Sequence, residues 1–236
     1  MQIIQENFPE VDIKKMQAFL ELFKERNKII NLSAIRDEQG IVEKHFFDSL
    51  LGLEFIKNKK RVIDLGSGGG FPVIALAICF PDAEFFAVES VGKKADSLRY
   101  FCKELGMNNL IVLCDRAETI AHDKKYRETF DALTARAFAH FPVLLEIGLP
   151  LLSINGEIVA YRGPNNAEEE ERLAEFLGGT SPRIVNKSLP NGDSREFWLI
   201  SKVKKCSAEY PRSIGVPKKN PLNLASLVKK GSDLAD

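Results

Sequence analysis

The chain has 236 residues, and its 33 Lys and Arg side chains balance its 33 Asp and Glu side chains, so the formal net charge is zero. The 44% of hydrophobic and 28% of charged residues are typical of a globular protein that is long enough to bury a core. The longest uncharged apolar run, Val73 to Phe80, falls far short of the roughly 20 residues of a transmembrane helix, and the N-terminus lacks the pattern of a signal peptide. We therefore expect a cytoplasmic protein with no membrane partner.

The cysteines argue against a metal site. None of Cys79, Cys102, Cys114 and Cys206 belongs to a CxxC pair, and the chain has only three histidines. Neither a zinc site nor a disulfide framework is therefore expected. The first three cysteines lie in apolar periodic segments, which predicts buried thiols in a reducing compartment.

Hydrophobic periodicity predicts helices first and an α/β pattern afterwards. Met16, Phe19, Leu20 and Phe23 follow the helical i, i+3, i+4, i+7 spacing, and a second helix is expected over 38–56. Strands are then expected at 61–65, 84–88, 110–114, 130–134 and 156–161, alternating with helices at 72–80, 91–105, 142–152 and 168–177. A strand pair at 182–188 and 195–203 closes the pattern, and a turn at 155–156 precedes the fifth strand.

This alternation predicts a Rossmann-like fold, in which a mostly parallel seven-stranded sheet carries helices on both faces. We expect three parts: an N-terminal helical extension over 1–57, an α/β domain over 58–205 and a basic tail over 206–236.

The zero net charge conceals a polarised distribution. Residues 202–236 hold eight basic and three acidic side chains, a net charge of +5, so residues 1–201 carry −5. A sum of zero argues against a nucleic-acid partner, but a basic tail restores that possibility, because charge distribution rather than the total determines binding.

A glycine-rich loop follows the first strand of the α/β pattern, at 66–70, where doubly wound sheets bind ligands. The segment lacks the GxxxxGK[ST] pattern of a phosphate-binding loop. It also fails the GxGxxG pattern of dinucleotide binding, whose sixth position is Phe71 or Val73 here.

S-adenosylmethionine fits this loop better. Its fold uses an acidic residue before the turn, a Gly-x-Gly turn and an acidic residue that ends the second strand. Asp64, Gly66, Gly68 and Glu89 supply this set, with Glu89 placed to accept hydrogen bonds from the ribose, and Asp115 flanks the expected adenine position. The alternative is that Asp64 and Glu89 only cap the helices that follow them.

Missing motifs narrow the chemistry of methyl transfer. The fourth strand is not followed by the [DN]PP[YFW] motif of exocyclic amino methylation, and no Cys follows the fourth or fifth strand to act as a nucleophile. A ring nitrogen such as guanine N7 remains, because it has a lone pair and no proton to remove. Arg136 is suited to bind the acceptor, a phosphate or the cofactor carboxylate, although a surface salt bridge is the simpler alternative.

Several motifs together resemble one family. They are NLSAI (31–35), KHFFDSL (44–50), VIDLGSGGGFP (62–72), TARAF (134–138) and YPRSIGVPKKNPL (210–222). They resemble the RsmG family, also called glucose-inhibited division protein B, over about residues 23–222. Two positions depart from the family pattern: Val73 stands where the family usually has Gly, and Glu89-Ser90 where it often has Asp-Ser.

The resemblance implies a bacterial class I S-adenosylmethionine-dependent methyltransferase that modifies N7 of one guanine in 16S ribosomal RNA, free or in the small ribosomal subunit. It also implies that Gly66, Phe71, Ala117, Glu118 and Arg136 contact the cofactor, with Arg136 serving catalysis as well.

The expected RNA contacts come from basic side chains near this site. Lys93, Lys94, Arg212, Lys218 and Lys219 are predicted to bind phosphates, which would make binding salt-dependent.

Aromatic side chains offer stacking partners for a splayed-out base, and Phe71, Phe138 and Tyr161 are the candidates, with the core as their alternative location. His45 and Asp48 share a helix face, either as a structural hydrogen-bonded pair or as RNA contacts.

Two other functions stay open at this point. The enzyme could methylate a protein or a small molecule, or the chain could be a non-catalytic RNA-binding module. A monomer is expected in each case.

Overall fold

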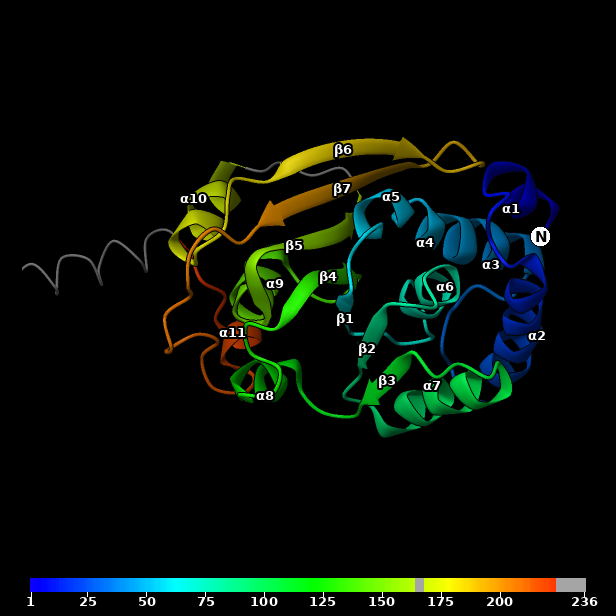
Figure 1. The fold of residues 1–236 in the computed structure, drawn as a ribbon, viewed down its shortest axis with the longest axis horizontal. Helices are drawn as coiled ribbons and strands as arrows, with labels where there is room; N and C mark the ends of the chain where they lie inside the picture. The colour runs from blue at the N-terminus through cyan, green and yellow to red at the C-terminus, as the bar shows by residue number, and fades with distance from the viewer. Residues whose placement is uncertain (164–167, 224–236) are drawn as a thin grey trace, which may run out of the picture.

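The computed structural model describes residues 1–163 and 168–223, and its centre is a seven-stranded sheet (Figure 1). The strand order is β3-β2-β1-β4-β5-β7-β6; β1 to β5 run parallel, and β7 is antiparallel to both β5 and β6. The strands are β1 (Arg61–Leu65), β2 (Glu84–Val88), β3 (Leu110–Leu113), β4 (Phe130–Arg136), β5 (Leu152–Arg162), β6 (Arg183–Ser188) and β7 (Ser194–Ser201). The predicted mostly parallel sheet is therefore confirmed.

Helices cover both faces of this sheet. The N-terminal helices are α1 (Gln2–Asn7), α2 (Ile13–Ile29), α3 (Glu38–Ile41), the π-helical turn η1 (Val42–Phe47), α4 (Asp48–Leu50) and α5 (Leu53–Ile56). Those that follow are α6 (Val73–Cys79), α7 (Gly92–Glu104), α8 (Ala117–His122), α9 (Phe141–Gly148), the 3₁₀ turn η2 (Leu149–Leu151), α10 (Glu168–Phe176) and α11 (Val216–Lys219).

Alternating side chains of the strands build two hydrophobic clusters, one on each face. Val62 of β1 belongs to the cluster that includes residues of α1, α2, α6 and α7, whereas its neighbour Ile63 belongs to the cluster that includes residues of α8, α9 and α10. Side chains two residues apart on a strand share a face, which explains the separation. The N-terminal helices belong to the first cluster, so the predicted extension is packed against the α/β core (Figure 1).

The second predicted helix, over 38–56, is not continuous. It changes to π-helical geometry at Val42–Phe47 and stops at Leu50, before α5 begins. A Cβ at Gly52 would overlap the Tyr161 hydroxyl, so only glycine permits this close approach. The Tyr161 hydroxyl donates a hydrogen bond to the Ser49 carbonyl (2.9 Å), which joins this helix to β5.

Two further expectations were wrong in detail. The turn predicted at 155–156 lies inside β5, which begins at Leu152, and Asn155 has a φ of +67° beside a register shift with β4. Cys102 is buried as expected, but Cys79 is only partly buried and Cys114 is exposed. Cys114 follows β3, which lies at the edge of the sheet, where apolar patterning does not guarantee burial.

The described part of the basic tail packs on the α/β core. Tyr210 and Leu222 are buried in the second hydrophobic cluster. Arg127 donates to the carbonyls of Tyr210 (2.8 Å) and Ser207 (3.1 Å). Lys202 is fully buried, with its ammonium 2.9 Å from Glu128, so this charge does not reach solvent. Part of the tail charge counted in the sequence therefore serves the fold.

Within residues 1–163 and 168–223, no helix combines the length and apolarity that spanning a membrane requires.

Candidate functional site

The glycine loop after β1 forms a cradle at the carboxyl end of the sheet. Gly66, Gly68 and Gly70 have φ angles of +73°, +51° and +97°, a region that glycine occupies without strain. A Cβ at Gly66 would lie 2.8 Å from the Phe138 ring. The loop is fixed at its start because Gly66 N–H and Ser67 N–H both donate to the Val88 carbonyl at the end of β2.

Glu89 links this loop to the start of α7. One carboxylate oxygen accepts from Gly68 N–H (3.0 Å) and the other from Val91 N–H (2.8 Å), and the side chain is 6% exposed. The contact with Val91 lies one residue before α7, which has no side-chain cap, so Glu89 supports the approach to this helix without capping it. Each carboxylate oxygen can accept a second hydrogen bond, so the ribose interaction expected for Glu89 stays a prediction that this geometry permits.

Asp64 is a buried carboxyl group beneath the cradle. Thr134 Oγ1 donates to its Oδ1 (2.6 Å), while Oδ2 is buried without a hydrogen-bond partner. Burial raises the pKa of Asp64 to about 6, against the opposing hydrogen bonds of Ser67 and Thr134. A buried oxygen without a partner at a ligand cradle is the kind of group that a bound molecule satisfies.

A cavity of about 270 Å³, which we call the first cavity, opens beside Glu89. It brings together five predicted cofactor residues, namely Gly66, Gly68, Glu89, Ala117 and Glu118. Asp115, Arg116, Phe138, Lys94 and Lys218 also line it. The carboxyl ends of β1, β2 and β3 converge here, as expected for the adenosine part of a nucleotide-like cofactor.

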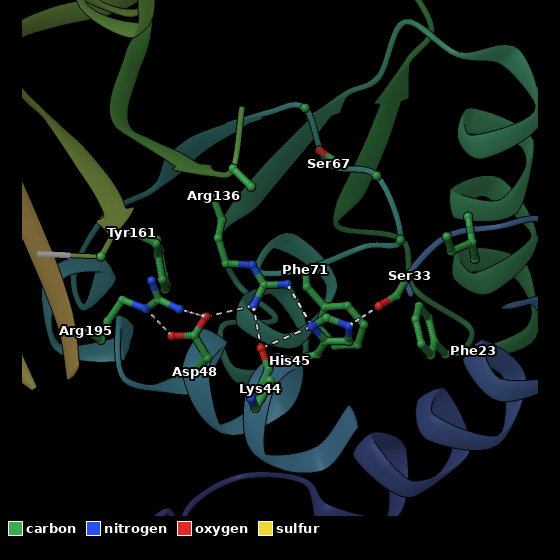
Figure 2. Close-up of a pocket in the computed structure, with 16 residues that line it drawn as sticks. Phe23, Ser33, Lys44, His45, Asp48, Ser67, Phe71, Arg136, Tyr161 and Arg195 are labelled. Carbon is green, nitrogen blue, oxygen red and sulfur yellow. Dashed lines mark hydrogen bonds and ion pairs between the residues drawn. The ribbon is translucent and has the colours of Figure 1, made fainter. Parts of the chain in front are cut away.

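A second cavity of about 480 Å³ adjoins the first, sharing Gly66, Gly68 and Ala137 with it. Arg136 and Phe71, the other two predicted cofactor residues, line this second cavity instead. Figure 2 shows its side chains, which come from the N-terminal helices, the glycine loop and the ends of β4, β5 and β7.

A buried carboxylate organises the second cavity. Asp48 is fully buried and binds two guanidinium groups: Arg136 Nη1 lies 2.9 Å from Oδ2, and Arg195 Nε lies 2.6 Å from Oδ1 (Figure 2). Arg136 also donates to the Lys44 carbonyl (3.2 Å). The two arginines outnumber the one carboxylate, so the cluster carries a net positive charge that faces the cavity. The salt bridge expected as an alternative for Arg136 exists, but it lies inside the site.

His45 contacts Arg136 rather than forming the pair with Asp48 that the sequence offered. Its ring stacks on Phe71 with centroids 5.1 Å apart, and its Nε2 lies 2.7 Å from Ser33 Oγ. Burial, with the charge of Arg136 second, lowers the pKa of His45 to about 4, so the ring is neutral near pH 7.

The stacking candidates differ in position. Phe71 is buried among Phe19, Phe23 and Phe46, and its contacts with these rings place it in the core beside the cavity. Tyr161 is 4% exposed and its hydroxyl is bound, so its ring is a core ring as well. Phe138 is only partly buried and lines both the first cavity and a third one of about 330 Å³ near Gly163.

The predicted RNA-binding residues are not equivalent either. Lys93, Lys218 and Lys219 are exposed, Lys94 and Lys218 line the first cavity, and the Nε and Nη2 atoms of Arg212 bind the buried Glu146. This edge of Arg212 is bound within the protein, and its contact with a phosphate stays a prediction. Sequence reasoning did not find Arg195, which lies 147 positions from Asp48. The one indication of a buried partner was the charged Asp48 itself, which stands among the hydrophobic residues Phe46, Phe47 and Leu50.

These residues fit S-adenosylmethionine on structural grounds. The glycine cradle admits a close ligand, Glu89 offers acceptors beside it and Asp64 Oδ2 lacks a partner. Ala137, with a φ of +53°, lies at the junction of all three cavities, where strained backbone is typical of a functional site. Among the described residues, no group of three or more His, Cys, Asp and Glu side chains is placed to hold a metal ion.

Comparisons with known proteins agree with this assignment. The family described as rRNA small subunit methyltransferase G (GidB) matches residues 12–188. A protein of that name from Lactococcus lactis is 36% identical over 89% of this chain and 91% of its own, and one from Roseiflexus is 40% identical over 84% and 86%.

A solved structure shows the same fold. The O-methyltransferase from Bacillus cereus in complex with SAH has a TM-score of 0.58 at 20% identity, over 85% of this chain and 96% of that chain. The fold is therefore that of the class I S-adenosylmethionine-dependent methyltransferases. Together with the relatives, it establishes that this chain belongs to the rRNA small subunit methyltransferase G family.

Proposed function

We propose that the protein transfers the methyl group of S-adenosylmethionine to N7 of a guanine in 16S ribosomal RNA. The choice of acceptor rests on one observation: the second cavity is lined by several positively charged side chains and by few groups that could act as a general base. Asp48 is buried and bound to two arginines, and the pKa of His45 is lowered to about 4. An acceptor that must lose a proton would need a general base, whereas guanine N7 attacks with a free lone pair.

The bound cofactor supplies an electrophilic methyl group on a sulfonium sulfur. The N7 lone pair forms the new N–C bond while the methyl–sulfur bond breaks and its electron pair returns to sulfur, so the reaction moves no proton. The protein contributes orientation, because holding two reactants in line converts a bimolecular reaction into an effectively unimolecular one. We assign to Arg136, held by Asp48 and the Lys44 carbonyl, the role of placing the acceptor base.

The ribosomal RNA substrate is supported by the names of the relatives and by exposed basic groups around the site. Lys93, Lys94 and Lys219 are the phosphate contacts that we propose, and removing one contact should reduce the slope of log K against log salt by about 0.7–0.9. Cytoplasmic location and a monomeric state are part of the same proposal.

The acceptor atom is tested with RNA that lacks it. The purified protein and methyl-labelled S-adenosylmethionine are incubated with unmodified 16S RNA, with unmodified small subunits and with a transcript that carries 7-deazaguanosine. We expect label on one guanine of natural RNA and none on the 7-deaza transcript. Label on the 7-deaza transcript would show a different acceptor atom. Label on protein alone, or bound cofactor without any transfer, would refute the proposed function.

A further inference from the structure

The C-terminal segment, residues 207–222, is fastened to the α/β core by a buried carboxylate. Glu146 of α9 is fully buried and receives three hydrogen bonds from Arg212: from its backbone N–H (2.8 Å), its Nε (2.9 Å) and its Nη2 (2.7 Å). Arg212 Nη2 also donates to the Asn220 carbonyl (2.8 Å), which draws the two ends of the segment together. A bidentate guanidinium–carboxylate pair of this kind fixes orientation as well as position.

A second attachment lies at the edge of the first cavity. Gly215 N–H donates to Glu118 Oε1 (3.0 Å), and Arg116 Nη2 lies 3.2 Å from the same oxygen. Burial alone would raise the pKa of Glu118, but the hydrogen bond from Gly215 and those around it lower it overall, so the carboxylate is charged when the segment is docked. One carboxylate oxygen of Glu118, a predicted cofactor residue, is thus bound by the segment.

These two attachments determine where α11 lies. The helix follows Gly215, which has a φ of +79°, and Figure 1 shows it beside α8 and α9. Lys218 of α11 lines the first cavity together with Glu89, Asp115 and Glu118. Both Lys218 and its neighbour Lys219 are exposed, but only Lys218 lines that cavity.

We propose that the C-terminal segment is part of the cofactor site, with Lys218 as the wall of the adenosine pocket that faces the carboxyl ends of β2 and β3. The proposal rests on the cofactor use in the proposed function and goes beyond the RNA contact that the sequence indicated for Lys218. A lysine covers an apolar surface such as the adenine face with its methylene stem, while its ammonium group turns toward polar partners. The carboxylates of Glu89 and Asp115 are such partners at this cavity.

Docking of the segment and binding of the cofactor are consequently coupled. A ligand that binds only the docked form stabilises that form by mass action. S-adenosylhomocysteine should therefore slow amide hydrogen exchange in residues 213–219, including the Gly215 N–H, relative to exchange in the β6–β7 hairpin. This measurement uses the unaltered protein and does not depend on methyl transfer.

Calorimetric titration with S-adenosylhomocysteine tests the role of Lys218. Lys218→Ala should raise the Kd about fivefold, as expected when a ligand loses contact with one lysine stem. Lys205→Ala removes an equal charge from an exposed position of the tail and should leave the Kd unchanged. Circular dichroism establishes that both variants fold.

The proposal is overturned if Lys218→Ala binds S-adenosylhomocysteine within twofold of the unaltered protein. It is also overturned if Lys205→Ala weakens binding equally, or if the ligand leaves exchange in residues 213–219 unaltered. Failure of the proposed function would look different, since binding would depend on Lys218 although no RNA became labelled.

Discussion

Replacing Asp48 by asparagine is the most informative perturbation of the second cavity. The substitution keeps the shape of the side chain but removes the charge that holds Arg136 and Arg195 together. Removing one partner of a buried ion pair costs about 3–5 kcal/mol of folding free energy. The two arginine side chains are 14% and 20% exposed, so water recovers part of this loss. We expect a destabilisation of about 2–3 kcal/mol, which for a chain of this length lowers Tm by about 4–12 °C.

The effect on the reaction should exceed the effect on stability. Without the carboxylate, Arg136 and Arg195 repel each other, and Arg136 loses its anchor beside the acceptor. A misplacement of about 1 Å costs roughly 100-fold in rate, so single-turnover methylation of 16S RNA by Asp48→Asn should fall by about that factor. The Kd for S-adenosylhomocysteine should change far less than the rate, because Asp48 lines the second cavity and not the first, where most of the predicted cofactor residues lie.

The matched control is Asp96→Asn. Asp96 pairs with Arg99 at the surface, 2.8 Å apart, and its side chain is 65% exposed. Surface pairs of this kind contribute little, so its thermal unfolding and its methylation rate should match those of the unaltered protein. Equal Tm and equal single-turnover rates for Asp48→Asn and Asp96→Asn would refute the reasoning about the buried carboxylate.

Three further substitutions separate the roles of the other groups. Arg136→Lys keeps the charge but loses the planar fork that binds Asp48 and the Lys44 carbonyl, so single-turnover methylation should fall about tenfold or more while the protein stays folded; an equal rate would remove Arg136 from the reaction. Glu89→Gln removes the charge beside Gly68 and should raise the Kd for S-adenosylhomocysteine about tenfold by calorimetry; an unchanged Kd would refute the ribose assignment. Asp64 holds its proton up to about pH 6 in the folded protein but loses it near 3.8 when unfolded, so the folded state loses stability as pH rises through this window. Asp64→Asn removes this dependence, and its stability relative to the unaltered protein should increase by up to about 3 kcal/mol between pH 4 and pH 7 in denaturant titrations; equal pH profiles would contradict the raised pKa.

The features that were predicted correctly from the sequence are those that local sequence patterns determine. Alternating strands and helices gave the parallel sheet, and the loop at 66–70 located the cradle, because strand ends and glycines have local signatures. The convergence of Glu89 and Asp115 on one cavity followed from the rule that parallel strands end at the same edge, whereas Ala117 and Glu118 were predicted from the family resemblance.

Local sequence patterns could not predict interactions between residues that are far apart in the chain. Arg195 meets Asp48 across 147 positions, and Arg212 meets Glu146 across 66, and neither spacing reflects any helical or strand period. The break near Gly52 arises from Tyr161, a residue of a distant strand. A count of charges in the tail could not show that Lys202 is buried, since the partner that compensates it, Glu128, comes from another part of the chain.

The π-helical turn at Val42–Phe47 determines which side chains of this helical segment face the second cavity. A π turn holds more residues than an α turn and is often found at functional sites. Deleting one residue there would let the segment relax into a regular α-helix, in which each residue turns the chain by about 100°. The helix would survive, but Lys44 and His45 could no longer face the same cavity as Asp48. Length variation among relatives should therefore be tolerated before α3 and selected against between Val42 and Asp48.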